Sequence, residues 1–167
     1  KNPVFNTYLE IAGITTDWYD AKEFNLINTT LNDTLYFRTE FKGGKGFDDN
    51  YNLSFYHTID DNNKSVVGLK KSDVSFRGNK WFINKKNNRK NRFIFDKKLD
   101  SIIIEKFVMN HQDEEIDFEG AIFGENNKNI NLQFINVGLE KITPSIDSIR
   151  LGGTVNGKLD IKQVNGG

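Results

Sequence analysis

The stretch from Asp73 to Ile122 constrains the fold of this chain more than any other part of it. It consists of short apolar runs at near-alternate positions, which read DVSFRG, WFIN, RFIF, SIIIEKFVMN and EEIDFEGAI. Each run is too short for a helix and rich in β-branched and aromatic residues, and polar breaks such as NKKNNRKN and NHQD separate the runs. Because this pattern is typical of strands that follow one another along the chain, it predicts one antiparallel sheet.

The same alternation continues on both sides of this stretch. The candidate strands are Thr7–Ile14, Phe24–Leu31, Leu35–Lys42, Tyr51–Ile59 and Ser65–Leu69 before it, and Ile130–Phe134 and the tail GGTVNGKLDIKQ after it. The sequence therefore predicts an all-β chain of about eleven or twelve strands. A sheet of this size with one apolar face curls onto itself, splits into a sandwich or leaves a groove, and the periodicity does not choose among these.

One segment departs from the strand pattern. In NVGLEKITPS, Leu139 and Ile142 are three residues apart, Asn136 is a possible N-terminal cap, and Pro144 stops a helix. These signals predict a short helix over Val137–Thr143, placed near one end of the sheet.

Composition limits the class of protein. With 167 residues the chain is expected to form one domain, and its formal charge is zero because 23 basic residues balance 23 acidic ones. Clustered positive charge, which nucleic-acid binding requires, is absent except in the run Lys85–Arg92, which we interpret as a solvated hairpin loop. No run reaches the ~18 apolar residues of a membrane-spanning helix. The chain begins at Lys1 without an initiating Met, so we expect a fragment of a larger protein, residues 1–167 forming a single module.

The residues that carry chemistry do not form a recognisable site. Cysteine is absent, which excludes thiol catalysis, thiolate metal sites and disulfides. His57 falls on the apolar face of a predicted strand, and His111 lies in the turn NHQDEE without the spacing of a metal site. A pair of carboxylates for glycoside hydrolysis, far apart in the sequence, remains compatible with this chain, although the acidic residues fall mainly in turns or at outward positions. We predict no catalytic residues, no metal and no cofactor.

The remaining feature is a stripe of large apolar side chains on one face of almost every predicted strand. Its members are Phe37, Phe41, Phe55, Phe76, Trp81, Phe93, Phe95, Phe118 and Phe134. For an isolated β domain such a stripe is typical of a packed core.

The order of several motifs resembles proteins of the TamB family, of the translocation and assembly module, with the Bacteroidetes-type members most similar. The similar segments are Ser72–Asn84, a strand followed by a spaced set of Gln112, Ile116 and Gly120, and the phrase Leu151–Leu159, LGGTVNGKL. The resemblance covers roughly residues 65 to 162, and residues 1 to 64 match no motif of the family. Each motif alone carries little information, and the order and spacing give the resemblance its specificity.

The resemblance implies a β-taco-like fold, an elongated rolled sheet with an apolar groove. TamB-like proteins are anchored in the inner membrane by an N-terminal helix, which would lie outside this fragment, and they cross the periplasm. They are thought to carry lipid to the outer membrane, or to support protein assembly there, with a barrel of the TamA or BamA type. By this resemblance the partners are lipid acyl chains, that barrel and neighbouring repeats of the same chain, with no nucleic acid, and the protein is not an enzyme.

The groove lining that this interpretation implies consists of the large apolar residues of the predicted strands. They are Phe37, Phe41, Leu53, Phe55, Phe76, Trp81, Phe93, Phe95, Ile102, Ile104, Ile116, Phe118, Leu132 and Phe134. Two other classes of protein remain open. A carbohydrate-binding β-sandwich would bury the phenylalanines and expose aromatic residues such as Trp18, Tyr19 and Tyr56, and a structural spacer of a cell-surface protein would have a packed interior and bind nothing.

Overall fold

The computed structural model describes residues 4–17, 19–44, 49–142 and 151–164, with twelve strands and one short helix. The strands are β1 (Thr7–Thr15), β2 (Asp20–Leu31), β3 (Thr34–Gly43), β4 (Asp49–Ile59), β5 (Ser65–Leu69), β6 (Ser72–Phe76), β7 (Asn79–Ile83), β8 (Arg92–Phe95), β9 (Ser101–His111), β10 (Glu114–Phe123), β11 (Asn127–Gly138) and β12 (Thr154–Gln163). The helix α1 spans Leu139–Ile142. The predicted all-β class with one short helix is confirmed, and no described helix has the length and apolar character needed to cross a membrane.

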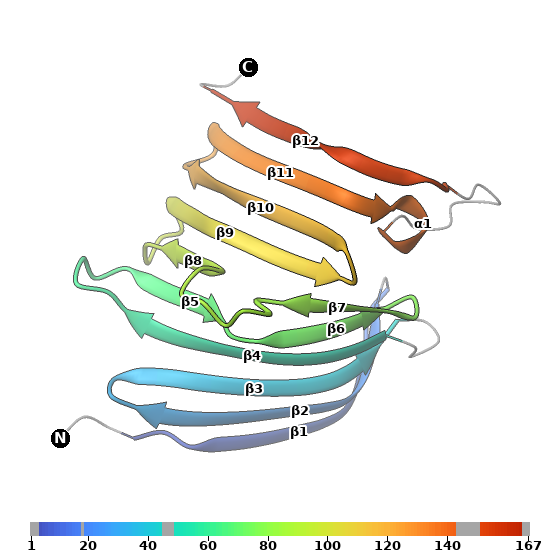
Figure 1. Cartoon of the computed structure of the whole chain (residues 1–167). Helices are drawn as coiled ribbons and strands as arrows, with labels where there is room; N and C mark the ends of the chain where they lie inside the picture. Colours follow the sequence, from blue (N-terminus) through green and yellow to red (C-terminus); the bar gives the residue numbers. More distant parts are fainter. Residues whose placement is uncertain (1–3, 18, 45–48, 143–150, 165–167) are drawn as a thin grey trace.

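All of these strands belong to one antiparallel sheet, in which the chain advances from one edge to the other. The edges are β1 and β12, and Figure 1 shows the two ends of the chain at opposite ends of the sheet. The sheet is curved, and the N-terminal strands bend away at one side of the view in Figure 1. The fold is therefore a rolled antiparallel sheet. The described strands form no second sheet, so the sandwich that the periodicity allowed is not the architecture.

In the middle of the sheet, two rows each consist of two short strands that lie end to end instead of one long strand. One row is β5 and β6, which both pair with β4, and the other is β7 and β8, which both pair with β9. Between these rows β5 pairs with β8 and β6 with β7. The basic run therefore does not close a hairpin, because β7 and β8 lie end to end along β9 and do not pair with each other. The prediction of a hairpin loop there is wrong.

The connection between β7 and β8, residues 84–91, is here called the asparagine loop. Asn84, Asn87 and Asn91 have positive φ angles of 49°, 48° and 62°, a conformation that asparagine tolerates better than most residues. Asn84 and Asn91 are 3 % and 0 % exposed. The Asn84 amide donates to Leu69 O (2.8 Å), and Asn91 Oδ1 accepts from Val108 N (2.8 Å). These side chains replace the strand-to-strand bonds that are lost where the rows break.

Three register shifts change which residues share a face, the first of them where β2 pairs with β3. Where β10 pairs with β9, Phe118 is paired with Phe107 and Gly120 is paired with Ile104. β9 therefore has one extra residue between Ile104 and Phe107. A similar shift between Phe134 and Val137 interrupts the pairing of β11 with β12. Such β-bulges re-aim the side chains that follow them. As a result Ile104 and Phe107, which strict alternation would place on opposite faces, lie on the same one.

The helix is shorter than predicted and has a different start. Val137 and Gly138 belong to β11, where they face Val155 and Thr154 of β12, and Thr143 lies outside the described residues. Asn136 does not cap the helix: it sits in the bulge with φ 54°, and its N–H donates to Asn156 Oδ1 (2.8 Å). The strand ladder with β12 thus extends up to the first residue of α1, where Leu139 N donates to Gly153 O (2.9 Å).

Candidate functional site: the apolar face

The register of the strands places every predicted lining residue on the same face of the sheet. Residues opposite one another on paired strands share a face, as do residues two apart along a strand. The pairs Phe37 with Phe55, Phe93 with Ile104, and Phe118 with Leu132 show how the face continues across the sheet. The predicted residues on this apolar face are Phe37, Phe41, Leu53, Phe55, Phe76, Trp81, Phe93, Phe95, Ile102, Ile104, Ile116, Phe118, Leu132 and Phe134.

On the N-terminal half of the apolar face, aromatic rings stack across neighbouring strands. Phe37 and Phe55 have ring centroids 4.9 Å apart, and Phe41 and Tyr51 are 4.4 Å apart with nearly parallel planes. Phe24 extends the second row onto β2, 5.7 Å from Phe41. Stacked rings of this kind add stability beyond the apolar area they bury, and they form a continuous hydrocarbon surface.

On the other half, the face becomes a small packed cluster. The rings of Phe107 and Phe118 are 4.7 Å apart, and Phe93 lies 6.0 Å and 6.4 Å from them. The buried members of the cluster are Val74, Trp81, Ile83, Phe107 and Val137. Phe107 is not among the predicted residues, because the bulge that brings it onto this face leaves only one signal in the sequence, an apolar residue out of phase with Ile104.

Most of the apolar face is not closed over. Among the predicted residues Trp81 is 2 % exposed, while the others are all partly exposed. Exposure rises toward the two edges, where Leu9 of β1 is 43 % exposed and Leu159 and Ile161 of β12 are 51 % and 45 % exposed. The accessible surface of the chain is 11270 Å², compared with about 8,400 Å² for a compact monomer of this length. The face is therefore not a fully packed core.

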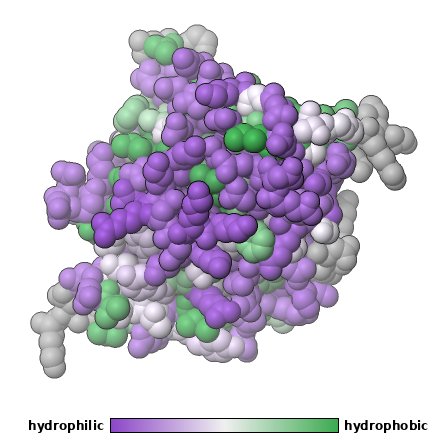
Figure 2. Space-filling view, in the orientation of Figure 1, coloured by the Kyte–Doolittle hydropathy of each residue, from purple (hydrophilic) through white to green (hydrophobic). Residues whose placement is uncertain are grey.

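The opposite face, here called the outer face, is polar. Figure 2 shows a mostly hydrophilic surface toward the viewer, with apolar side chains scattered between polar ones. Ion pairs join neighbouring strands on the outer face: Arg92 contacts Glu105 and Lys106 contacts Asp117, at 2.7 Å and 2.6 Å. Water therefore wets the outer face, and the two faces of one sheet differ sharply in polarity.

A buried carboxylate marks one end of the apolar face. Glu114, 5 % exposed, accepts hydrogen bonds from Gly138 N (2.8 Å) and Lys141 Nζ (2.9 Å). Burial favours the neutral acid, but the Lys141 ammonium and the Gly138 N–H outweigh it and hold the pKa of Glu114 below its usual range. Glu114 therefore fastens α1 and the end of β11 to the turn between β9 and β10.

The two histidines have structural surroundings. His111 Nδ1 lies 2.8 Å from Lys80 O, its Nε2 is 3.9 Å from Glu114 Oε2, and its ring is 5.4 Å from that of Trp81. His57 is half-buried on the apolar face, between Leu35 and Val67. In the part of the chain that the structure describes, no three His, Cys, Asp or Glu residues are placed to hold a metal ion.

The aromatic residues considered for carbohydrate binding do not form one platform. Tyr19 donates to the hydroxyl of Tyr51 at 2.8 Å and belongs to the apolar side, whereas Tyr56 lies on the outer face beside Tyr36. Trp18 lies outside the described residues.

Comparison of the chain with protein-family models, with curated proteins and with solved structures finds no match.

Proposed function

We propose that this chain is a segment of a TamB-like protein that spans the periplasm, and that its apolar face holds lipid acyl chains on their way to the outer membrane. The observation that carries the proposal is the continuity of the apolar face from β1 to β12, together with its incomplete burial. The order of motifs between residues 65 and 162 adds the family resemblance. The role is non-catalytic.

The energetics of acyl-chain transfer fit such a face. Each methylene removed from water is worth about 0.8 kcal/mol, so a chain of lipid length needs a long apolar path without wide polar gaps. The stacked rings of Phe37 with Phe55 and of Phe41 with Tyr51 provide a path in the N-terminal half. Phe93 and Phe118 continue it toward β12. The polar outer face of the same sheet would stay in contact with the water of the periplasm.

The edges of the sheet suggest how the segment would join its neighbours. β1 and β12 each pair with one strand among the described residues, so each carries a row of backbone groups available to another strand. We propose that preceding and following repeats of the same protein pair with these edges. The apolar face would then continue from one repeat to the next, toward an outer-membrane barrel of the TamA or BamA type. Protein assembly at that barrel is the other role compatible with this arrangement.

Native mass spectrometry of the purified chain tests the proposal. Co-purified phospholipid, removed by detergent and restored by added phospholipid, is the expected result. A matched pair of variants controls for nonspecific binding of lipid. Phe55→Ser changes the apolar face and should reduce the bound lipid, whereas Ser54→Ala changes its neighbour on the outer face and should not. Binding of added glycan without lipid would favour the carbohydrate-binding alternative, and binding of neither would favour the structural spacer.

A further inference from the structure

The asparagine loop lies on the side of the outer face and borders an open hollow of about 660 Å³. The hollow is bordered on one side by loop residues and on the other by the outward residues of β9 and the start of β10. The lining residues that carry charge or an unmet donor are Lys85, Lys86, Lys90, Asn91, Lys106 and Glu115. Its volume falls in the range of small-molecule sites. It is separate from the apolar face, because Lys106, Val108 and Asn110 point to the opposite side of the sheet from Phe107 and Met109.

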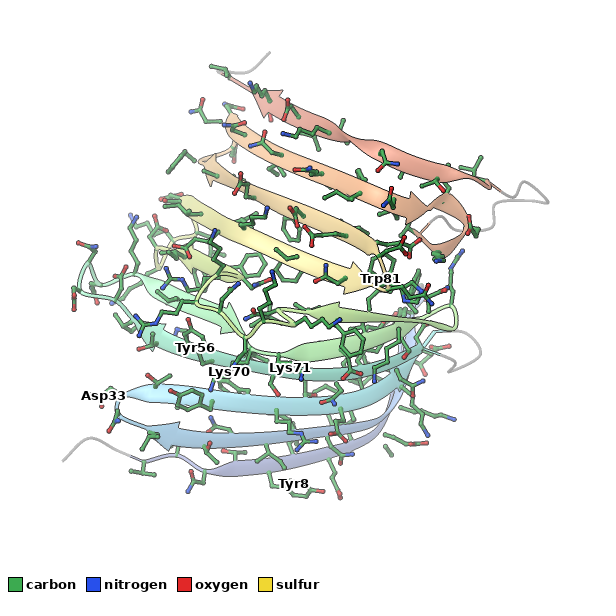
Figure 3. The ribbon with its side chains drawn as sticks, viewed as in Figure 1. Tyr8, Asp33, Tyr56, Lys70, Lys71 and Trp81 are labelled. Atoms are coloured by element: carbon green, nitrogen blue, oxygen red, sulfur yellow. The ribbon has the colours of Figure 1, made fainter. Side chains whose placement is uncertain are left out.

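Positive charge around this hollow exceeds negative charge. Lys106 is balanced by its ion pair with Asp117, but Lys85, Lys86 and Lys90 outnumber Glu115, the one carboxylate in the lining. No ion pair within the described residues involves Lys85, Lys86, Arg89 or Lys90, and the same holds for Lys70 and Lys71 at the adjacent break between β5 and β6. Figure 3 shows Lys70 and Lys71 in the middle of the sheet, near Tyr56. The formal charge of the chain is zero, so this excess of cations is a local property of the loop and its surroundings. Clustered cations beside a hollow attract anions.

An unpaired hydrogen-bond donor lies at the base of the loop. Asn91 Oδ1 accepts from Val108 N, which fixes the orientation of the amide, and leaves Asn91 Nδ2 buried with no partner among the described residues. Asn84, at the other end of the loop, differs because its Nδ2 donates to both Leu69 O and Asn88 O. Buried donors are normally satisfied, so an unmet one beside a ligand-sized hollow is suited to an acceptor oxygen of a ligand.

The lysines and the free amide favour the same kind of ligand. An acceptor oxygen would satisfy Asn91, and a negative charge on the same group would satisfy the ammonium groups of Lys85, Lys86 and Lys90. We propose that the hollow binds a phosphate group, carried by a small phosphorylated molecule or by a phospholipid headgroup. A phosphate offers several acceptor oxygens and up to two charges, which suits a hollow lined by several ammonium donors. The site does not depend on the acyl-chain role of the opposite face.

The test compares two triple variants of equal charge change. Lys85→Gln/Lys86→Gln/Lys90→Gln removes the cations of the hollow, and Lys97→Gln/Lys98→Gln/Lys162→Gln removes exposed cations elsewhere. Inorganic phosphate is titrated at constant ionic strength, with chloride as the reference anion, and binding is followed by NMR. We expect the side-chain amide signal of Asn91 to shift, and the phosphate dissociation constant to rise at least about tenfold in the first variant only. An equal response of both variants, or no phosphate response beyond that of chloride, would overturn the proposal.

Asn91→Asp provides an independent variant, because it keeps the Oδ1 acceptor of Val108 N and replaces the unpaired donor by a negatively charged oxygen. We expect it to abolish the NMR response to phosphate, while the backbone amide NMR spectrum remains that of a folded protein. Phosphatidylcholine vesicles with and without phosphatidic acid then distinguish the sources of the phosphate. Binding that requires phosphatidic acid and is lost in the loop variant identifies a headgroup, whereas a response to free phosphate alone identifies a small phosphorylated molecule.

Discussion

Lys141 Nζ lies 2.9 Å from Glu114 Oε1, and this contact joins the single helix of the described chain to a carboxylate buried at the end of the apolar face. The two residues are far apart in the sequence and come from the start of β10 and from α1. Because Glu114 also accepts from Gly138 N, the loss of its charge would weaken the attachment of both α1 and the end of β11.

Glu114→Gln should therefore lower the free energy of unfolding by about 1–3 kcal/mol, because it removes the charged acceptor of one buried and one part-buried hydrogen bond. Glu140→Gln, on the exposed side of the same helix, is the matched control and should change it little. Urea denaturation of both variants provides the measurement. Equal stability of Glu114→Gln and wild type would show that the contact does not hold the helix.

The same carboxylate should make stability depend on pH. The pKa of Glu114 in the folded chain lies below its ordinary value of 4.5, so its contribution is fully present above that value and is lost as the pH falls through the folded pKa. Thermal unfolding measured from neutral pH down into this acidic range should show a steeper loss of stability for wild type than for Glu114→Gln. Parallel curves for the two proteins would contradict this assignment.

Gly120 tests how closely the strands of the sheet approach at the bulge. A Cβ atom at this position would lie 2.2 Å from Asn129 O and 2.8 Å from Ile130 Cα, which are backbone atoms of β11. Gly120→Ala should thus force the strands apart and cost about 1–3 kcal/mol of unfolding free energy. Gly157→Ala on β12, where nothing lies within 4 Å of the added methyl, is the control and should be nearly neutral. Comparable denaturation midpoints for the two variants would count against the close approach of β10 and β11.

Asn84 tests the asparagine loop, because its backbone conformation and its side chain can be altered separately. Asn84→Gly keeps the φ of 49° accessible but loses the bonds to Leu69 O and Asn88 O, whereas Asn84→Ala loses the same bonds and also strains the backbone. We expect Ala to be less stable than Gly by about 1–2 kcal/mol. Chemical denaturation of the two variants measures the difference. The reverse order would show that the loop does not require this conformation.

Much of the fold can be predicted from the sequence, because a strand with one apolar face leaves a period of two. Leu35, Phe37 and Phe41 alternate with polar residues, and β3 contains all of them on one face. Residues as distant as Phe37 and Phe134 lie on the common face that the pattern predicts, since an antiparallel sheet joins such stripes from strand to strand.

What the sequence does not predict depends on contacts between strands. The extra residue between Ile104 and Phe107 follows from the pairing of β9 with β10, and its one local sign is that Phe107 is out of phase with Ile104. Asn136 is a common helix-capping residue type, yet pairing with β12 draws it into a bulge. The sequence predicts a solvated hairpin loop over Lys85–Arg92. The burial of Asn91, and of Asn84 just before this run, follows from the broken rows of β5 to β8, which lie side by side only in the folded sheet.

Whether the apolar face holds acyl chains is tested most directly by photocrosslinking in cells. A photoreactive amino acid is placed at Phe55 or Phe118 on the apolar face, and at Arg38 or Glu119 on the outer face as matched controls. We predict lipid adducts at the first two positions and none at the controls. Equal labelling of both faces, or no lipid at Phe55 and Phe118, would contradict it and leave a structural spacer as the better explanation of this sheet.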